Sequence, residues 1–166
     1  MAMVTGELSR ETFLSGMRGA DLDRLATAAR SVEFPAGRRL ATEPEPAEQF
    51  WIIREGTIDL DSRMPGGGSI SIETVGPGSV VGWSWMFPPY RWRFGAVAST
   101  PVEAVEFDGR LVRVLCTVDP SLGYELTRRF AEVMAHRLQT ARARLLTSSP
   151  GTVLGTGQPE QRSTDG

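Results

Sequence analysis

The sequence has no lysine and no asparagine, and only one cysteine and one histidine among its 166 residues. All 18 basic side chains are therefore arginine, and 20 acidic ones balance them to a formal charge of -2. A chain with so little net charge has no overall field that would draw it onto nucleic acid or an anionic membrane. Any anion site must therefore be local. The arginine bias itself is typical of a G+C-rich coding sequence and carries no functional weight.

The shortage of cysteine and histidine argues against several kinds of chemistry. Cys116 has no partner for an internal disulfide and, within the apolar run LVRVLC, is expected to pack as a small hydrophobic residue. His136 has no second histidine or cysteine pair near it, so we expect a solvent-exposed side chain and no metal site. Neither a Ser-His-Asp, a Cys-His nor a metalloprotease spacing is present. The sequence predicts a protein that is not an enzyme and has no resident cofactor.

Long apolar runs are also missing, since none approaches the roughly 18 residues of a membrane span. The first ten residues, MAMVTGELSR, lack the apolar centre of a secretion signal. We therefore expect a cytoplasmic protein without membrane contact. A 40% apolar content suffices for one core, so we expect one domain over residues 1–147. Residues 148–166 are too polar to offset their ordering entropy and are expected to form a disordered tail.

The residues that are present predict a mainly β fold between helices. Two short helices are expected before a break at Pro35, from apolar residues at helical spacing: Phe13, Leu14 and Met17, then Leu22, Leu25, Ala28 and Ala29. From there to about residue 107, short segments separated by Gly and Pro predict strands. The clearest are 57–61 and 69–75, joined by a hairpin loop at 65–68. Their isoleucines and Leu60 are expected to face the core, and Asp59 and Asp61 the solvent.

The last part of the chain predicts two helices, one short and one long. Asp108 is expected to cap a helix that runs through Cys116, and Asp119 followed by Pro120 is a strong start for the next helix. Apolar residues then recur every three or four positions as far as Leu145. This stripe is longer than one small domain needs for packing. We therefore expect a homodimer through a helix over about 120–147.

One segment, from Gly76 to Ala98, is unusually rich in glycine, proline and tryptophan. Gly82 and Arg93 have the chemistry of a phosphate cradle, because glycine lets backbone N–H groups converge and arginine offers a planar fork of donors. An ordinary turn between strands is the plainer interpretation of the same composition. The aromatic residues either form one wall that stacks a planar ligand or pack a loop: Trp83, Trp85, Phe87, Tyr90 and Trp92.

Several motifs together resemble a known family. The stretch from Phe34 to Leu60, with Gly37 and Gly56 at turns, resembles its opening strands, GPGSVVGW and RFGAVA resemble its phosphate-binding cassette, and MAHRLQTARARL resembles its dimerisation helix. Over residues 10–147 the chain thus resembles the effector domain of the catabolite-activator (Crp/Fnr) superfamily of cyclic-nucleotide-binding proteins. The resemblance implies a double-stranded β-helix (jelly-roll-like) roll of about eight strands, with short N-terminal helices and a long C-terminal helix.

The resemblance also implies where a ligand would bind, and where this chain departs from its family. The family cassette has a Gly-Glu pair and, about ten residues later, an arginine followed by a small polar residue. Gly82 and Arg93 match, whereas Trp83 replaces the glutamate and Phe94 the small residue. On the long helix, two further residues replace the hydroxyl pair that contacts adenine. The candidate ligand-binding residues are Gly82, Trp83, Ser84, Arg93, Phe94, Gly95, Ala141 and Arg142.

These substitutions set the functional expectations. Losing one hydrogen bond to a carboxylate weakens binding by about 10-fold to 150-fold, so ordinary cAMP sensing is not expected. We expect a regulatory module that binds a cyclic nucleotide or another small anion in a non-standard pocket. The alternative is a ligand-free dimeric structural or protein-interaction module in which Trp83 and Phe94 plug the pocket. No helix-turn-helix pattern follows Leu146, so direct DNA binding is not expected, and any output would pass through an unidentified protein partner.

Overall fold

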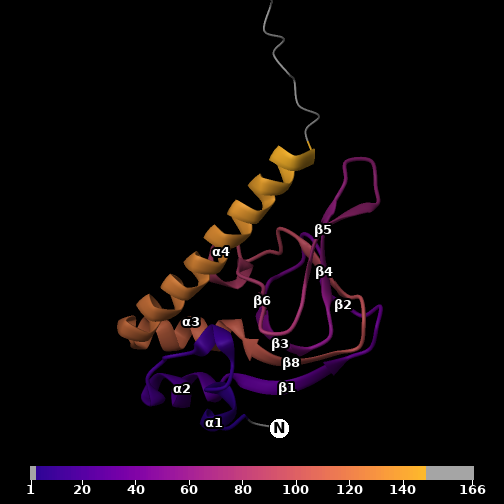
Figure 1. The fold of residues 1–166 in the computed structure, drawn as a ribbon. Coiled ribbons are helices and arrows are strands. Elements are labelled where there is room, and N and C mark those ends of the chain that lie inside the picture. The colour runs from indigo at the N-terminus through magenta and orange to yellow at the C-terminus, as the bar shows by residue number, and fades with distance from the viewer. Residues whose placement is uncertain (1–2, 149–166) are drawn as a thin grey trace, which may run out of the picture. The chain divides into compact units, whose positions relative to one another are not determined.

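The computed structural model describes residues 3–148. The expected tail at 148–166 lies outside these residues, apart from Ser148. Within the described residues the chain divides into two compact units, the first ending at Val133 and the second beginning at Met134. The first contains two antiparallel sheets with helices beside them (Figure 1), and the second contains the C-terminal half of the last helix.

The strands of the first unit form a roll of two four-stranded sheets. Sheet A has the order β1 (Ala29–Phe34), β8 (Val102–Asp108), β3 (Gln49–Glu55) and β6 (Val80–Val81). Sheet B has the order β2 (Arg39–Ala41), β7 (Gly95–Ala98), β4 (Ile58–Arg63) and β5 (Ser69–Val75). All pairs are antiparallel. The expected roll of about eight strands is confirmed.

Strand β3 separates two apolar cores, and its sequence explains why. Successive side chains of a strand point to opposite faces. Trp51 and Ile53 belong to the core inside the roll, whereas Phe50 contacts the ring of Phe130 on the last helix, with centroids 5.3 Å apart. A strand that is buried on both faces has no polar alternation, so its sequence is a continuous apolar run.

The N-terminal helices differ from the expectation in number and at their ends, since the described residues contain three instead of two and Met17 lies outside them. They are α1 (Thr5–Leu8), the 3-10 helix η1 (Thr12–Leu14) and α2 (Gly19–Ala26). Contrary to the expectation, Ala28 and Ala29 are not helical. The Ala28 carbonyl accepts from Asp108 N at 2.9 Å, and Ala29 already pairs with Phe107 in the sheet. Strand β1 therefore precedes Pro35. Most residues of β1 are exposed or only partly buried, so the strand shows little of the apolar and polar alternation that identifies a strand in a sequence.

The two C-terminal helices begin as predicted. Asp108 Oδ1 accepts from the backbone N–H groups of Arg110 and Leu111, at 3.0 and 3.2 Å, and starts α3 (Gly109–Val118). Asp119 Oδ1 accepts from Ser121 N at 3.1 Å at the start of α4 (Pro120–Ser148). Within residues 3–148, no helix combines the length and the hydropathy of a membrane span.

The β4–β5 hairpin corrects two further expectations. Asp61 is buried and not solvated, because it forms an ion pair with Arg39. Ile70 and Ile72 are 55% and 49% exposed and not part of the core. A register shift between Leu60 and Asp61 leaves Ile72 opposite no residue of β4. Ile70 pairs with Ser62, beyond the last core residue of that strand, Leu60. Such bulges change which face a side chain occupies, and alternation alone does not reveal them.

Candidate functional site

The candidate site is the segment that connects β6 to β7, residues 82–94, which we call the cassette. It begins at Gly82, whose φ of +99° is one that L side chains rarely adopt. A β-carbon there would also lie 3.0 Å from Trp92 Cη2 and 3.3 Å from the Gln49 carbonyl. Glycine is therefore required both by backbone conformation and by the close approach of the Trp92 ring.

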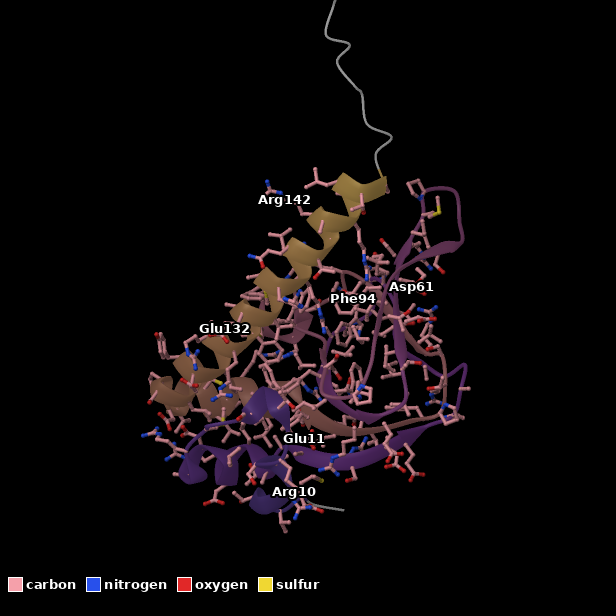
Figure 2. The ribbon with its side chains drawn as sticks, viewed as in Figure 1. Arg10, Glu11, Asp61, Phe94, Glu132 and Arg142 are labelled. Atoms are coloured by element: carbon pink, nitrogen blue, oxygen red, sulfur yellow. The ribbon has the colours of Figure 1, made fainter. Side chains whose placement is uncertain are left out.

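The second half of the cassette alternates between the inside and the outside of the roll. Trp92 and Phe94 are only 4% and 9% exposed and belong to the core inside the roll, and Figure 2 shows Phe94 among the strands. Arg93, between them, is exposed. This alternation directs two aromatic rings inward and the guanidinium group outward.

Five aromatic rings form a continuous group inside the roll, which we call the inner cluster. Trp92 stacks on Trp51 with centroids 5.8 Å apart and meets Phe94 edge-on at 5.8 Å. Trp83 is tilted against Phe94 at 5.6 Å, and Phe34 meets Trp51 at 6.5 Å. The two residues that replace the family's polar pair are thus packed on one another. Sequence reasoning missed the contributions of Phe34 and Trp51, which come from β1 and β3.

Trp85 lies on the other face of sheet A, so the aromatic residues of the cassette do not form one wall. Its ring stacks on Phe50 at 4.9 Å, whereas Trp92 stacks on Trp51, the next residue of the same strand. Trp85 Nε1 donates to the Gly82 carbonyl at 3.2 Å, and the Trp85 carbonyl accepts from Arg113 Nη1 at 2.6 Å. These two bonds hold the short 3-10 helix η2 (Ser84–Met86) between Gly82 and α3.

Two polar groups of the cassette have no protein partner within residues 3–148. The hydroxyl of Ser84 is buried and accepts or donates no hydrogen bond. The Arg93 side chain forms neither a hydrogen bond nor an ion pair with the described residues, although most other arginines of the roll do. The cassette therefore keeps hydrogen-bonding capacity that the protein itself does not use.

Gly95 directly follows the cassette and lies next to a partly buried ion pair. Arg39 Nη2 and Nη1 donate to the two carboxylate oxygens of Asp61 at 2.7 and 3.2 Å. The hydrogen bond to Asp61 raises the pKa of Arg39 further above its ordinary value. A β-carbon at residue 95 would overlap this pair, so Gly95 leaves the space that Asp61 and Arg39 occupy.

The remaining candidate residues lie on α4. Ala141 and Arg142 are exposed there, in the unit that starts at Met134. A role for them in contacting a ligand stays a prediction. Among residues 3–148, no three His, Cys, Asp or Glu side chains gather in a way that would hold a metal ion.

The comparison with protein families supports the resemblance seen in the sequence. The model of the cyclic nucleotide-binding domain matches residues 31–119, just over half of the chain, and includes the whole cassette. The chain therefore belongs to the cyclic nucleotide-binding domain family, a class of regulatory effector-binding modules.

Solved structures show the same fold. A protein from Geobacter metallireducens GS-15, described as a cyclic nucleotide-binding protein, is 24% identical with a TM-score of 0.74, over 82% of this chain and 98% of that one. A cyclic nucleotide-binding domain from Methylobacillus flagellatus KT is 19% identical with a TM-score of 0.73, over 91% and 85%. The regulatory subunit of a cAMP-independent protein kinase A from Trypanosoma cruzi, bound to guanosine, is 25% identical with a TM-score of 0.58, over 80% and 49%.

Proposed function

We propose that this chain is a regulatory, non-enzymatic module that binds a small anionic effector at its cassette but does not sense cAMP in the ordinary way. The observation that carries the proposal is the division of the cassette into an inward aromatic half and an outward polar half. Trp92 and Phe94 are buried, whereas Arg93 between them is exposed and has no partner among the described residues.

The aromatic residues of the inward half support the proposal that this chain does not recognise cAMP in the ordinary way. An indole N–H is only a donor, so Trp83 offers no acceptor for a ribose hydroxyl. Its ring packs on Phe94, which in turn contacts Trp92, and the Trp92 ring occupies the space beside Gly82. A ligand that enters there would have to displace aromatic contacts, each of which contributes about 0.5 to 1.5 kcal/mol beyond burial.

The outward half supports a remaining capacity for anions. A guanidinium group presents a rigid fork of N–H donors that matches phosphate and carboxylate oxygens. The buried Ser84 hydroxyl has no protein partner, and leaving such a group unsatisfied costs about 1 to 3 kcal/mol. A bound ligand or water molecule would explain why this hydroxyl is tolerated.

The alternative function is a ligand-free dimeric structural or protein-interaction module. The continuity of the inner cluster favours it, because Trp83, Phe94 and Trp92 pack on one another inside the roll. In either case we propose that the output passes through another protein. The formal charge of -2 gives no field that would attract DNA.

Calorimetric titration of the full chain with cGMP, 5′-AMP and guanosine tests whether the outward half of the cassette binds an anion. We expect a nucleotide with a phosphate to bind more tightly than guanosine, because only the phosphate contacts Arg93. Arg93→Ala should weaken nucleotide binding by about 2 to 5 kcal/mol, and Arg93→Lys should restore part of it, since lysine keeps the charge but not the fork.

Arg38→Ala is the matched control, because Arg38 is exposed and its side chain has no hydrogen bond or ion pair with the described residues. It should leave nucleotide affinity unchanged. If no nucleotide binds, and Arg93→Ala changes only the melting temperature, the proposal fails and the ligand-free module takes its place.

A further inference from the structure

A separate cleft opens where three segments of the first unit meet. It has a volume of about 230 Å³ and lies between the β2–β3 connection, residues 89–91 of the cassette and the first turns of α3. We call it the basic cleft and define it by Glu48, Tyr90, Arg91, Arg110 and Arg113. It has room for a group the size of phosphate.

The charges of the basic cleft are not balanced. Three arginines line it, together with a single acidic residue, Glu48. Glu48 Oε1 lies 3.6 Å from Arg110 Nη1, a long ion pair. Arg91 donates to the Pro44 carbonyl at 3.2 Å, which is a neutral acceptor. The excess of positive charge lies within the cleft, although the chain as a whole carries a formal charge of -2, and such a local excess attracts anions.

Arg110 adds to this imbalance through its position in the helix. It lies in the first turn of α3, which contains no acidic residue. A cation is unfavourable there because the backbone N–H groups already carry partial positive charge. Asp108 Oδ1 accepts from the N–H groups of Arg110 and Leu111, so this carboxylate offsets the partial positive charge of the helix start. An anion in the cleft would offset the charge of the guanidinium groups that line it.

Backbone and side-chain bonds hold the walls of the cleft in place. Ala47 N donates to the Tyr90 carbonyl, and Gly109 N to the Glu48 carbonyl, both at 2.7 Å. Arg113 Nη1 donates to the Trp85 carbonyl at 2.6 Å, and its guanidinium carbon lies 4.0 Å above the Tyr90 ring. Arg113 is therefore oriented before any ligand arrives, which lowers the entropic cost of binding.

The conformation of Tyr90 also indicates a binding role. Its φ is +56°, the only positive value at a residue other than glycine within residues 3–148. Such a conformation is unusual for a bulky side chain, and strained residues of this kind gather at ligand clamps and active sites. Here the strained residue places its ring under Arg113, on the cleft wall.

We propose that the basic cleft is a second anion site, which binds the phosphate dianion of a phosphomonoester or free phosphate through Arg91, Arg110 and Arg113. The site is distinct from Arg93, and the proposal does not depend on whether the cassette binds a nucleotide. Because Arg113 is bonded to the Trp85 carbonyl and Trp85 Nε1 to the Gly82 carbonyl, an anion in the cleft contacts the residues that hold the start of the cassette.

The test uses the full chain carrying Arg93→Ala, so that the cassette arginine cannot contribute. Inorganic phosphate and N-acetyl-phosphoserine amide are titrated at about 0.15 M ionic strength, where exposed charges are screened, with binding followed by NMR of the Tyr90 and Arg113 resonances. Acetate serves as the monoanion comparator. Equal affinity for both phosphates indicates recognition of the dianion alone, and tighter binding of the phosphoserine compound indicates a phosphorylated protein as the source.

Arg110→Gln and Arg91→Gln are each expected to weaken phosphate binding by about tenfold or more, as removal of a charged hydrogen-bond donor does. The control Arg38→Gln should leave it unchanged. Folding of every variant is checked by the dispersion of the same spectra. The proposal is overturned if phosphate does not bind saturably, if the cleft variants bind as the parent does, or if Arg38→Gln weakens binding equally.

Discussion

Ser84 is the residue at which the contribution of packing to stability can be separated from the contribution of ligand binding. Its hydroxyl is buried in the cassette without a protein partner, so removing it cannot break a hydrogen bond within the described residues. Ser84→Ala is expected to raise the free energy of unfolding of the ligand-free protein by up to about 1 kcal/mol, through loss of an unsatisfied polar group. Urea denaturation measures this. A loss of more than about 1 kcal/mol would mean that the hydroxyl is bonded in solution.

A substitution at Gly95 tests the partly buried ion pair that follows the cassette. A β-carbon there would overlap the Asp61 carboxylate and the Arg39 guanidinium, so Gly95→Ala must displace one or both. Breaking a partly buried charged pair of this kind should lower the free energy of unfolding by about 2 to 4 kcal/mol. Gly76→Ala is the control, because it has open space and an ordinary φ, and it should be near neutral. Equal stability of the two variants in thermal or urea denaturation would contradict this account.

At single residues, features that depend on local chemistry follow from the sequence, whereas features that depend on a partner strand do not. Asp108 and Asp119 were identified as helix caps because a cap needs only the next three residues. The burial of Asp61 depends on Arg39 and on the space above Gly95, which come from two other strands. A single sequence contains no signal for that pairing.

At the scale of elements, the start of α4 is fixed to the N-terminal helices by a charged network. Glu125 accepts from Arg128 at 2.7 Å and from Arg129 at 2.9 Å, and Arg129 also donates to the Phe13 carbonyl at 2.8 Å. The hydrogen bond from Arg128, followed by that from Arg129, lowers the pKa of Glu125 below its ordinary value. Glu125 thus orients the arginine that joins α4 to η1.

A lowered pKa in the folded state means that Glu125 stabilises the fold above its unfolded pKa, and that this contribution is lost as the pH falls through the folded pKa. Glu125→Gln should therefore lower the melting temperature modestly at neutral pH, and the difference from wild type should vanish in the acid range. Calorimetric scans over pH measure it, with Glu103→Gln, at an exposed strand position, as control. A difference that persists at acid pH would exclude this charge network as its source.

The elements themselves were predictable to different degrees. The long helix has a strong N-cap and a stripe of apolar residues, and its buried half confirms that stripe at Leu122, Leu126 and Phe130. Strand β1 was missed because its pairing with β8, and not an alternating pattern, defines it. The alternation of residues 69–75 predicts Ile70 in the core, but the bulge in β5 and the position of this strand at the sheet edge move Ile70 outside it.

At the scale of the whole molecule, exposed apolar residues in the C-terminal half of α4 predict a homodimer. Leu138 and Leu145 are 70% and 69% exposed, and an apolar stripe of this kind on a helix typically packs on a second helix. Light scattering after size exclusion should give twice the 18.1 kDa chain mass. Leu138→Glu combined with Leu145→Glu should give a monomer, while Val118→Glu, 79% exposed on α3, should stay dimeric. A monomeric wild type would refute the dimer.

The sequence predicts the residues of the site that lie close together along the chain, but not the partners that other strands bring to them. The family resemblance located the cassette and its two departures, Trp83 and Phe94, and these two rings are in contact. The partners of the inner cluster, Trp51 and Phe34, were not foreseen, because they come from strands that meet the cassette only through the closure of the roll. Whether the rings exclude a ligand is a question of energy, which neither the spacing of residues nor their identity answers.

The most direct test of the account is therefore a calorimetric titration of wild type and Trp83→Glu with cAMP. The account predicts that wild type binds cAMP more weakly than low micromolar, because the Trp83 side chain offers no acceptor and Trp92 of the inner cluster occupies the space beside Gly82. Trp83→Glu restores the acceptor and should tighten binding by up to about 10-fold to 150-fold. A wild-type dissociation constant for cAMP in the low micromolar range or below would contradict the central claim.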